Sequence, residues 1–344
     1  MSVDPLLDRH GRPLRSLRLS VTDRCNFRCS YCMPEEEYSW LPREDILSLE
    51  EMARLVQAFA QVGVTKVRFT GGEPLLRKNF TELIRQVAAI PEIEDIALTT
   101  NAMLLAAQAS SLKSAGIQRL NISLDTLDRA RFQSLTRRDA LPQVLEGIQA
   151  AKDAGFRGTK LDTVLIRGTN DDEVIPLLEF AAEENLQLRF IEYMDVGGAT
   201  HWSASQVVPR EEIVQKVSAH FGAVEDVPLQ DPSAPARLYR TASGMKFGII
   251  ASTTTPFCSD CDRGRVTADG TWFSCLYAQK GTDLRNALRD GRSTSDLVQV
   301  LRDLWSNRDD RGAEQRLTAK ERGPAVSLDD LLADPLLEMH TRGG

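Results

Sequence analysis

Cys25, Cys29 and Cys32 stand close together in the early stretch RLSVTDRCNFRCSYCMP, with the spacing C-x3-C-x2-C. Three thiolates this close can bind one metal centre. A structural zinc site normally takes four protein ligands, and no other Cys or His follows this trio before His201. A [4Fe-4S] cluster ordinarily uses four thiolates, so a cluster on three keeps one iron open to a small molecule. The spacing therefore favours an iron–sulfur centre with its chemistry at the open iron; a half zinc site is the alternative.

Cys258, Cys261 and Cys275 form a second trio, again without a nearby fourth Cys or His. A zinc ribbon would carry a second C-x2-C pair in place of the lone Cys275. All six cysteines fall into the two trios, and in a reducing compartment such grouping indicates metal ligation instead of disulfides. Zinc at the second trio is the weaker alternative.

The composition excludes some classes of function. The chain has 344 residues and a formal net charge of -7, which argues against a large electrostatic surface for nucleic acid or anionic membrane. An anionic substrate would need a focused basic pocket. The sequence shows no apolar stretch typical of a signal peptide or long enough to span a bilayer, so we expect a cytoplasmic protein.

The cysteine loops must be positioned by the surrounding elements. Apolar strand patterns alternate with helical patterns, and Gly63, Gly116, Gly155 and Asn185 stand where helices give way to strands. Six such units predict parallel βαβ connections, which periodicity alone leaves open between an open sheet and a full or partial barrel. The expected strands are 17–21, 66–70, 95–99, 119–123, 159–164 and 187–193.

Polar residues gather just after these strands. They are the first cysteine loop and the segments 70–73, 99–101, 123–125 and 192–194. Ligands bind at this edge in barrels and in parallel sheets. Gly71-Gly72-Glu73-Pro74 lacks the form of a phosphate loop, but paired glycines let the backbone approach a ligand closely. A plain tight turn is the alternative for this segment.

From about residue 224 the repeating pattern ends. Pro228, Pro232 and Pro235 mark a loop, and short strands are expected at 236–240 and 245–252. A hairpin is expected over 265–273, followed by helices at 283–289 and 295–305. We therefore predict two parts, residues 1–225 and 226–344, each holding one cysteine trio.

The first trio, with Tyr31 before its last cysteine, resembles that of the radical S-adenosylmethionine (SAM) enzymes. Longer motifs narrow the resemblance to the GTP 3′,8-cyclase family of molybdenum-cofactor biosynthesis. They are SVTDRCNFRCSYCMP, VRFTGGEPLLR, LTTNAMLL, NISLDTLD, TVLIRGTNDDE, PFCSDCDRGRVTADG and the terminal Gly-Gly. The resemblance implies an α/β fold, namely a partial (βα)6 TIM-type barrel with a C-terminal α+β iron–sulfur region.

The resemblance also implies site residues. Each trio would hold a [4Fe-4S] cluster with an open iron, one for SAM and one for the guanine of GTP. SAM contacts fall on Tyr31, Gly72, Glu73, Ser123 and Met194. GTP contacts fall on Arg18, Arg68, Thr99, Lys160, Arg263, Gly264 and Arg265. Arg265 and the tail glycines Gly343 and Gly344 are expected to assist the reaction.

The chemistry that the resemblance implies is radical cyclisation. A 5′-deoxyadenosyl radical would take the 3′ hydrogen of GTP, and C3′ would add to C8 of guanine, giving 3′,8-cyclo-7,8-dihydro-GTP. An electron donor is required, and the product would pass to a cyclic pyranopterin monophosphate synthase; the resemblance also allows a homodimer. The basic set fits an independent argument, because an acidic protein must meet a triphosphate with converging Arg and Lys side chains.

Two departures and two alternatives accompany this interpretation. The residues 339–342 differ from the usual ending of the family, and Asp162 stands where Asn is common. One alternative is another radical SAM enzyme with an auxiliary cluster, acting for example on a peptide, which would not bind GTP. The other is a noncatalytic iron–sulfur or zinc protein in electron transfer or RNA binding, which would not cleave SAM.

Overall fold

The computed structural model describes residues 6–319 and 322–343, and it contains a twelve-stranded sheet in the order β12-β11-β10-β1-β2-β3-β4-β5-β6-β9-β8-β7. The strands are β1 (Ser16–Ser20), β2 (Lys66–Thr70), β3 (Asp95–Thr100), β4 (Arg119–Ser123), β5 (Lys160–Leu165), β6 (Gln187–Glu192), β7 (Val224–Val227), β8 (Arg237–Thr241), β9 (Lys246–Ile250), β10 (Arg263–Val266), β11 (Thr271–Phe273) and β12 (Thr282–Asp283).

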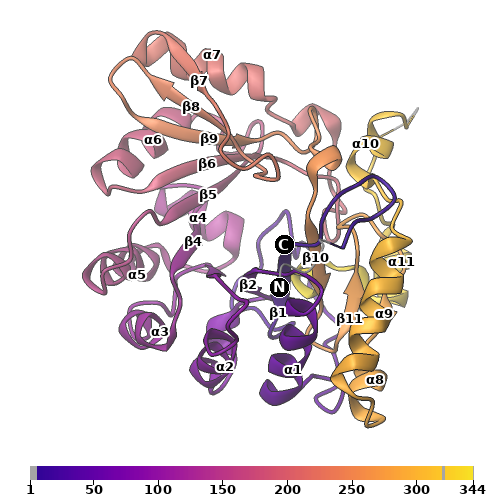
Figure 1. Ribbon diagram of the computed structural model, residues 1–344. Helices are drawn as coiled ribbons and strands as arrows, with labels where there is room; N and C mark the ends of the chain where they lie inside the picture. Colours follow the sequence, from indigo (N-terminus) through magenta and orange to yellow (C-terminus); the bar gives the residue numbers. More distant parts are fainter. Residues whose placement is uncertain (1–5, 320–321, 344) are drawn as a thin grey trace.

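The structure contains helices after the central strands and in the C-terminal part of the chain. They are α1 (Leu49–Ala60), α2 (Phe80–Ala88), α3 (Ala109–Ala115), α4 (Arg129–Thr136), α5 (Leu141–Asp153), α6 (Val174–Glu183) and α7 (Arg210–Phe221), then α8 (Arg285–Arg289), α9 (Thr294–Ser306), α10 (Gly312–Leu317), α11 (Leu328–Ala333) and α12 (Met339–Arg342). In Figure 1 the strands β1 to β6 form an open arc with α1, α2, α3, α5 and α6 outside it. The predicted partial barrel is confirmed.

The six predicted barrel strands are present, and each observed bound lies within one residue of its prediction. All their mutual pairings are parallel. The residues predicted at the helix-to-strand connections are confirmed as well. All four have positive φ, namely Gly63, Gly116, Gly155 and Asn185. The helix α1 begins with the capping box of Ser48 and Glu51.

Strand alternation separates the core from the barrel interior. On β1, Leu17 and Leu19 are buried in the main apolar core, which lies between the sheet and the helices, whereas Arg18 between them lines an internal cavity. The same alternation on β2 buries Val67 and Phe69 and turns Arg68 inward. Apolar burial therefore fixes which side chains can face a ligand.

The C-terminal part of the chain completes both ends of the barrel sheet. The strand β9 pairs with β6, and β10 pairs with β1, both in parallel. The predicted hairpin is formed by β10 and β11, which pair antiparallel. The predicted boundary between residues 225 and 226 falls inside β7, a strand of the same twelve-stranded sheet. The division into two parts stays a prediction.

Several C-terminal elements differ from expectation. The observed β9, α8 and α9 differ from the predicted 245–252, 283–289 and 295–305 by one or two residues at an end. The sequence did not predict β7, β12 or the short helices α10, α11 and α12. On α9 the buried stripe consists of Leu297, Leu301 and Trp305.

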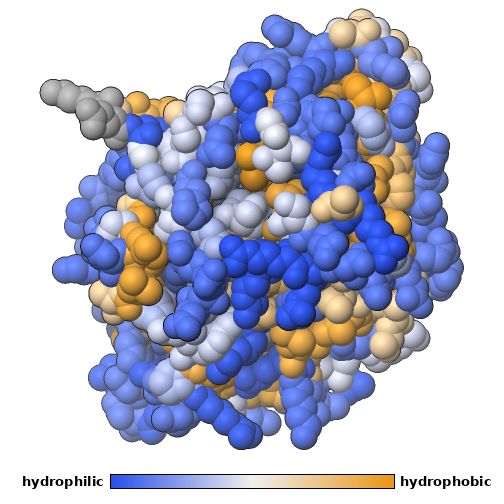
Figure 2. All heavy atoms as spheres, turned by 180° about the vertical axis from the view of Figure 1, so that it is seen from behind, coloured by the Kyte–Doolittle hydropathy of each residue, from blue (hydrophilic) through white to orange (hydrophobic). Residues whose placement is uncertain are grey.

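The surface seen from behind in Figure 2 is mostly hydrophilic, with apolar side chains in small areas between charged ones. In the portion of the chain that the structure describes, no helix is both long and apolar enough to cross a membrane.

Candidate active site inside the barrel

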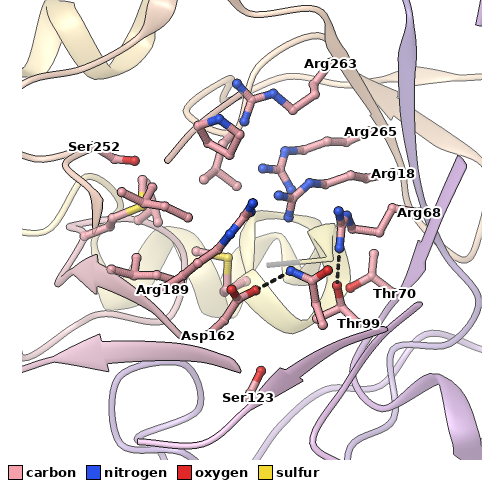
Figure 3. Close-up of a pocket in the computed structure, with 18 of the residues that line it drawn as sticks. Arg18, Arg68, Thr70, Thr99, Ser123, Asp162, Arg189, Ser252, Arg263 and Arg265 are labelled. Carbon is pink, nitrogen blue, oxygen red and sulfur yellow. Dashed lines mark hydrogen bonds between the residues drawn. The ribbon is translucent and has the colours of Figure 1, made fainter. Parts of the chain in front are cut away.

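A cavity of about 490 Å³ lies inside the arc of strands. Its walls include all six cysteines, the Gly71-Gly72-Glu73 turn and the inward side chains of β1 to β6. Both cysteine trios therefore face one shared space, and a molecule bound there can contact both. Figure 3 shows the arginines that converge on it.

The first trio lies on the loop after β1. The amides of Cys32 and Met33 both donate to the Cys29 carbonyl oxygen, at 2.9 and 2.7 Å. Burial raises the pKa of Cys25 to about 11. Burial and the neighbouring charges of Asp125, Cys25 and Cys32 raise the pKa of Cys29. The three thiols are thus close enough to repel one another when ionised, a cost that a shared metal centre would remove.

The paired glycines hold the strand β2 turn against this cysteine loop. The amide of Gly72 donates to the Thr22 carbonyl oxygen at 2.9 Å, and that of Glu73 donates to the Arg24 carbonyl oxygen at 2.7 Å. A Cβ on Gly72 would overlap the carbonyl group of Arg24. The sequence predicted that the backbone approaches a ligand here; the close neighbour that the structure shows is the cysteine loop, and the approach to a ligand stays a prediction.

The Glu73 side chain turns towards the end of β3. Its carboxylate accepts hydrogen bonds from Thr100 Oγ1 at 2.7 Å, from the Asn101 amide at 2.8 Å and from the Leu75 amide at 3.1 Å. Burial raises the pKa of Glu73 to about 7, against the effect of these hydrogen bonds. Glu73 therefore anchors the turn, and its predicted contact with SAM stays a prediction.

The other predicted SAM residues also line the cavity. They are Tyr31, Gly72, Ser123 and Met194. The Tyr31 hydroxyl donates to Asp125 Oδ2 at 2.8 Å, which fixes its ring beside the first trio. Asp125 also accepts from the Val164 amide at 2.8 Å, so one buried carboxylate joins the cysteine loop to β5.

Three arginines stand side by side across the sheet. Arg18 on β1 is in register with Arg265 on β10 and with Arg68 on β2. Burial, and then the charge of Arg265, lowers the pKa of Arg18 well below its ordinary value. Burial likewise lowers the pKa of Arg68 to about 10 and that of Arg265 to about 10. Like charges held together in a buried cavity indicate an anion site.

Lys160 and Arg189 also line the cavity, and together with Arg18, Arg68 and Arg265 they form what we call the basic wall. Burial, followed by the charges of Arg189, Arg119 and Arg68, lowers the pKa of Lys160 to about 7. Sequence reasoning missed Arg189, which points into the cavity in Figure 3. The alternation on β6 could have identified it, because Leu188 and Phe190 on either side are buried in the core. Lys66 was also missed; it lines the cavity and pairs with Asp231 at 2.7 Å.

Asp162 supplies an opposing charge on the cavity floor. Asn121 Nδ2 donates to Asp162 Oδ2 at 2.6 Å. Within the described residues, the Oδ1 atoms of Asn121 and Asp162 are buried without a hydrogen-bond partner. Two unused acceptors in a polar cavity can receive hydroxyl or amine donors of a ligand. The remaining predicted contact on this side, Thr99, receives a hydrogen bond from Arg68 Nη1 at 3.4 Å.

The second trio lies across the cavity. Cys258 begins a short turn, Cys261 precedes β10, and Cys275 follows β11. Burial raises the pKa of Cys275 to about 11. Burial also raises the pKa of Cys261, but the charges of Arg263 and Arg308 outweigh it and leave that pKa below its ordinary value. The donor chemistry suits an iron–sulfur cluster at either trio.

Over residues 6–319 and 322–343, no three Cys, His, Asp or Glu side chains are grouped so that they could hold a single metal ion. The ligand roles of both trios stay predictions.

Two predicted residues of β10 face opposite ways. The Arg263 side chain lines the cavity, with its guanidinium 4.7 Å from the ring centre of Phe257. Gly264 lies on the other face, where an added Cβ would come within 2.8 Å of Trp272 Nε1. Only the backbone of Gly264 could contribute to the predicted GTP contact.

The C-terminal tail reaches the cavity. Arg265 Nη1 donates to the Gly343 carbonyl oxygen at 2.8 Å. Gly343 has a φ of +68°, and a Cβ there would overlap the side chain of Thr70. Arg342 Nη1 donates to the Leu276 carbonyl oxygen at 2.9 Å, which ties the tail to the second trio. Gly344 lies outside the described residues, so its predicted role stays a prediction.

Two stretches of this chain match models of known protein families. Residues 19–181 match the radical SAM superfamily, and residues 186–314 match the Molybdenum Cofactor Synthesis C family.

Similar curated proteins share one name, GTP 3′,8-cyclase. A Mycobacterium bovis protein named GTP 3′,8-cyclase 3 is 52% identical over 344 residues, covering 99% of this chain and 91% of that protein. A Mycobacterium tuberculosis protein named GTP 3′,8-cyclase 1 is 50% identical over 341 residues, covering 98% and 95%. An Acidothermus cellulolyticus GTP 3′,8-cyclase is 45% identical over 322 residues, covering 91% and 89%.

Among solved structures, Streptococcus suis SuiB has a similar fold. The TM-score is 0.60 at 15% identity, and the match covers 89% of this chain and 68% of SuiB. The structure of SuiB bound to S-adenosylmethionine gives a TM-score of 0.58 at 12% identity, over 91% of this chain and 68% of SuiB.

Proposed function

Because this chain belongs to the GTP 3′,8-cyclase family of the radical SAM superfamily, we propose that its barrel cavity converts GTP to 3′,8-cyclo-7,8-dihydro-GTP. This is the first step of molybdenum-cofactor biosynthesis. Membership of the superfamily implies a [4Fe-4S] cluster and SAM, which together supply the radical that takes the ribose 3′ hydrogen.

The observation that carries the proposal is the basic wall between the two trios. Arg265, Arg18 and Arg68 are in register on adjacent strands, and Lys160 and Arg189 continue the wall across β5 and β6. An acidic protein concentrates these charges in one enclosed space. A triphosphate supplies the compensating charge, and planar guanidinium groups are shaped to bind it with two hydrogen bonds each.

The residues around the first trio would bind and orient SAM. The contacts proposed are Tyr31, Gly72, Glu73, Ser123 and Met194, with Cys25, Cys29 and Cys32 as cluster ligands. Tyr31 is held by Asp125, and Gly72 lines the cavity while its backbone packs against the cysteine loop. This arrangement would position the cofactor, and the barrel wall would exclude water from it.

The opposite side of the cavity would hold GTP. Arg18, Arg68, Lys160, Arg189, Arg263 and Arg265 are proposed to bind the nucleotide, with Thr99 and the Gly264 backbone completing the set. We propose that Cys258, Cys261 and Cys275 bind a second [4Fe-4S] cluster beside the guanine. Gly343 and Gly344 are proposed to help shape the productive complex, and Arg265 donates a hydrogen bond to Gly343.

Other parts of the proposal concern partners. The reaction needs an electron donor, and the product would be consumed by a cyclic pyranopterin monophosphate synthase. Homodimer formation and a cytoplasmic location stay predictions.

The decisive experiment is anaerobic reconstitution with iron and sulfide, followed by incubation with SAM, GTP and a reductant. We expect about eight irons per chain for two clusters, and 5′-deoxyadenosine formed together with the cyclised nucleotide when GTP is present. A control with ATP in place of GTP should give no cyclised product. Zinc at either trio, or SAM cleavage with no product from GTP, would contradict the proposal.

A further inference from the structure

An ionic cluster, buried except for the Asp310 side chain, which is 24% exposed, lies behind the second trio, apart from the residues that line the cavity. It consists of Asp8, Arg12, Arg308 and Asp310, which come from opposite ends of the chain. Arg12 is 2% exposed, Arg308 is 4% exposed and Asp8 is 7% exposed. Charged side chains are almost never buried to this extent without a specific reason.

Asp8 fixes both guanidinium groups. Arg12 Nε donates to Asp8 Oδ2 at 2.6 Å, and Arg308 Nη1 lies 3.4 Å from the same oxygen. Trp305 also contributes, because its Nε1 donates to the Arg12 carbonyl oxygen at 3.0 Å and its ring lies 4.4 Å from the Arg308 guanidinium. The two cations are therefore rigid and shielded from solvent.

Both guanidinium groups also donate to backbone carbonyl groups of cysteine residues in the second trio. Arg12 Nη1 donates to the Cys258 carbonyl oxygen at 2.9 Å. Arg308 Nη1 donates to the Cys261 carbonyl oxygen at 2.9 Å. A network that only joined the two ends of the chain would need the pairs with Asp8 and Asp310 alone. These two additional hydrogen bonds fix the backbone of two of the three thiol-bearing residues.

The remaining charges near the trio are unevenly placed. Asp310 accepts from Arg308 Nε at 3.1 Å and from Ser274 Oγ at 2.6 Å, so its negative charge lies on the Cys275 side. Arg263 adds a positive charge near Cys261, with Asp262 3.8 Å from its Nε. Glu314 adds a negative charge near Cys258. Arg308 therefore lies closest to Cys261, and its charge acts on that thiol directly.

We propose that Arg12 and Arg308 position the second cysteine trio and raise the reduction potential of the iron–sulfur cluster bound there. This inference rests on the proposed function, because the second cluster is part of it. Reduction adds one negative charge to a cluster, and buried cations with hydrogen bonds to its ligand residues stabilise the reduced state. Arginine keeps its charge at every relevant pH, so the effect would be permanent.

The test isolates the second cluster in the full chain. With Cys25, Cys29 and Cys32 replaced by Ala, only the second trio can take up iron during anaerobic reconstitution. The midpoint potential is then measured by dithionite titration with electron paramagnetic resonance. Arg308→Gln should lower the equilibrium constant for reduction at least tenfold, which is about 59 mV for one electron. Arg12→Gln should shift it in the same direction.

Two further variants separate charge from geometry. Arg308→Lys keeps the charge but cannot donate to Cys261, Asp8 and Asp310 together, so we expect a smaller shift with lower iron occupancy. Arg302→Gln removes the same charge from α9, the helix that precedes Arg308, and should leave the potential unchanged.

The outcomes are distinguishable. An unchanged potential in Arg308→Gln with full iron occupancy would overturn the inference and leave the proposed function intact. No iron uptake in the parent with the first trio replaced would refute the second cluster itself. Loss of second-trio iron from Arg308→Gln, with circular dichroism like that of Arg302→Gln, would support the positioning role. Should Arg308→Gln not fold, Arg12→Gln and Arg308→Lys decide by the same measurement.

Discussion

At the scale of single residues, Lys160 is the member of the basic wall whose charge changes near neutral pH. A lysine normally keeps its charge far above neutral pH, but burial and the surrounding arginines lower the pKa of Lys160 to about 7. The cavity therefore gains or loses one positive charge close to physiological pH. Binding of an anion favours the charged form of the lysine.

We predict that the affinity for GTP falls as the pH rises above about 7. In the free protein Lys160 is protonated below this pH and neutral above it, so binding GTP at higher pH must first take up a proton. The Kd should increase by up to tenfold per pH unit. Isothermal titration between pH 6 and 9 measures it. Lys160→Arg keeps its charge, so its pH profile should be flat in this range, and parallel profiles for the two proteins would contradict the prediction.

Arg189 tests the part of the wall that the sequence did not reveal. It is held beside Asp162, with which it is in register on adjacent strands. We predict that Arg189→Gln raises the Kd for GTP by ten- to a hundredfold, because one charge-assisted interaction contributes about 1.5–3 kcal/mol. SAM binding should change little. The control is Arg157→Gln, which removes an exposed charge from the loop before β5; equal losses in both variants would reject a local role for Arg189.

At the scale of elements, the barrel strands could be predicted because their signals are local. Alternation of apolar and polar residues sets the bounds of β1 and β2, and the same alternation turns Arg18 and Arg68 inward. The order of the strands follows from the parallel connections. In contrast, α12 is stabilised by contacts with residues distant in sequence, such as the hydrogen bond from Arg342 to Leu276. The sequence of α12 itself does not predict these contacts.

The site shows the same division. The cysteine spacing and the Gly-Gly turn are local motifs, so the sequence predicts both and the structure brings them together. The direction of the Glu73 side chain depends on donors from β3, and the ion cluster of Arg12 and Arg308 joins residues almost a whole chain apart. Such contacts exist only after the sheet has formed, so no short stretch of sequence contains both partners.

The contact between the turn after β2 and the cysteine loop leads to a prediction at this scale. Gly72→Ala should lower the iron bound at the first trio to well below the wild-type value and reduce stability by about 1–3 kcal/mol, the usual cost of overpacking. The added Cβ would overlap the Arg24 carbonyl group and push the loop away. Iron content and thermal unfolding measure the two effects. Gly323→Ala is the control, since, its chain neighbours aside, no atom of the described residues lies within 4 Å of the added Cβ. Wild-type iron content in Gly72→Ala would contradict the close approach.

At the scale of the whole molecule, Asp195 joins three regions around the cavity. It follows β6 and is fully buried. Arg316 Nε and Arg322 Nε donate to its Oδ2 at 2.9 and 3.0 Å, and the Tyr277 hydroxyl donates to its Oδ1 at 2.9 Å. Tyr277 lies two residues after Cys275, and Met194 precedes Asp195. One carboxylate therefore links the proposed SAM side, the second trio and the C-terminal segment.

We predict that Asp195→Asn destabilises the protein by about 3 kcal/mol, as expected when one partner of a buried ion pair is removed. The two arginine side chains are only 23% and 15% exposed, so water compensates them poorly. The C-terminal segment should also become more sensitive to limited proteolysis. Glu82→Gln is the matched control, because it breaks an ion pair with Arg85 whose side chains are 51% and 58% exposed, and such pairs contribute less than about 1 kcal/mol.

The pH dependence of this difference tests the cause. Burial raises the pKa of Asp195, but the hydrogen bonds from Arg322, Arg316 and Tyr277 lower it more, so the folded value lies below the ordinary one. A depressed pKa contributes stability that is fully present above the unfolded value, about 3.9, and is lost as the pH falls through the folded value. The stability gap between wild type and Asp195→Asn should therefore be constant near neutral pH and shrink below about pH 4. A gap that persists in acid would mean that shape, and not the charge of Asp195, holds the three regions together.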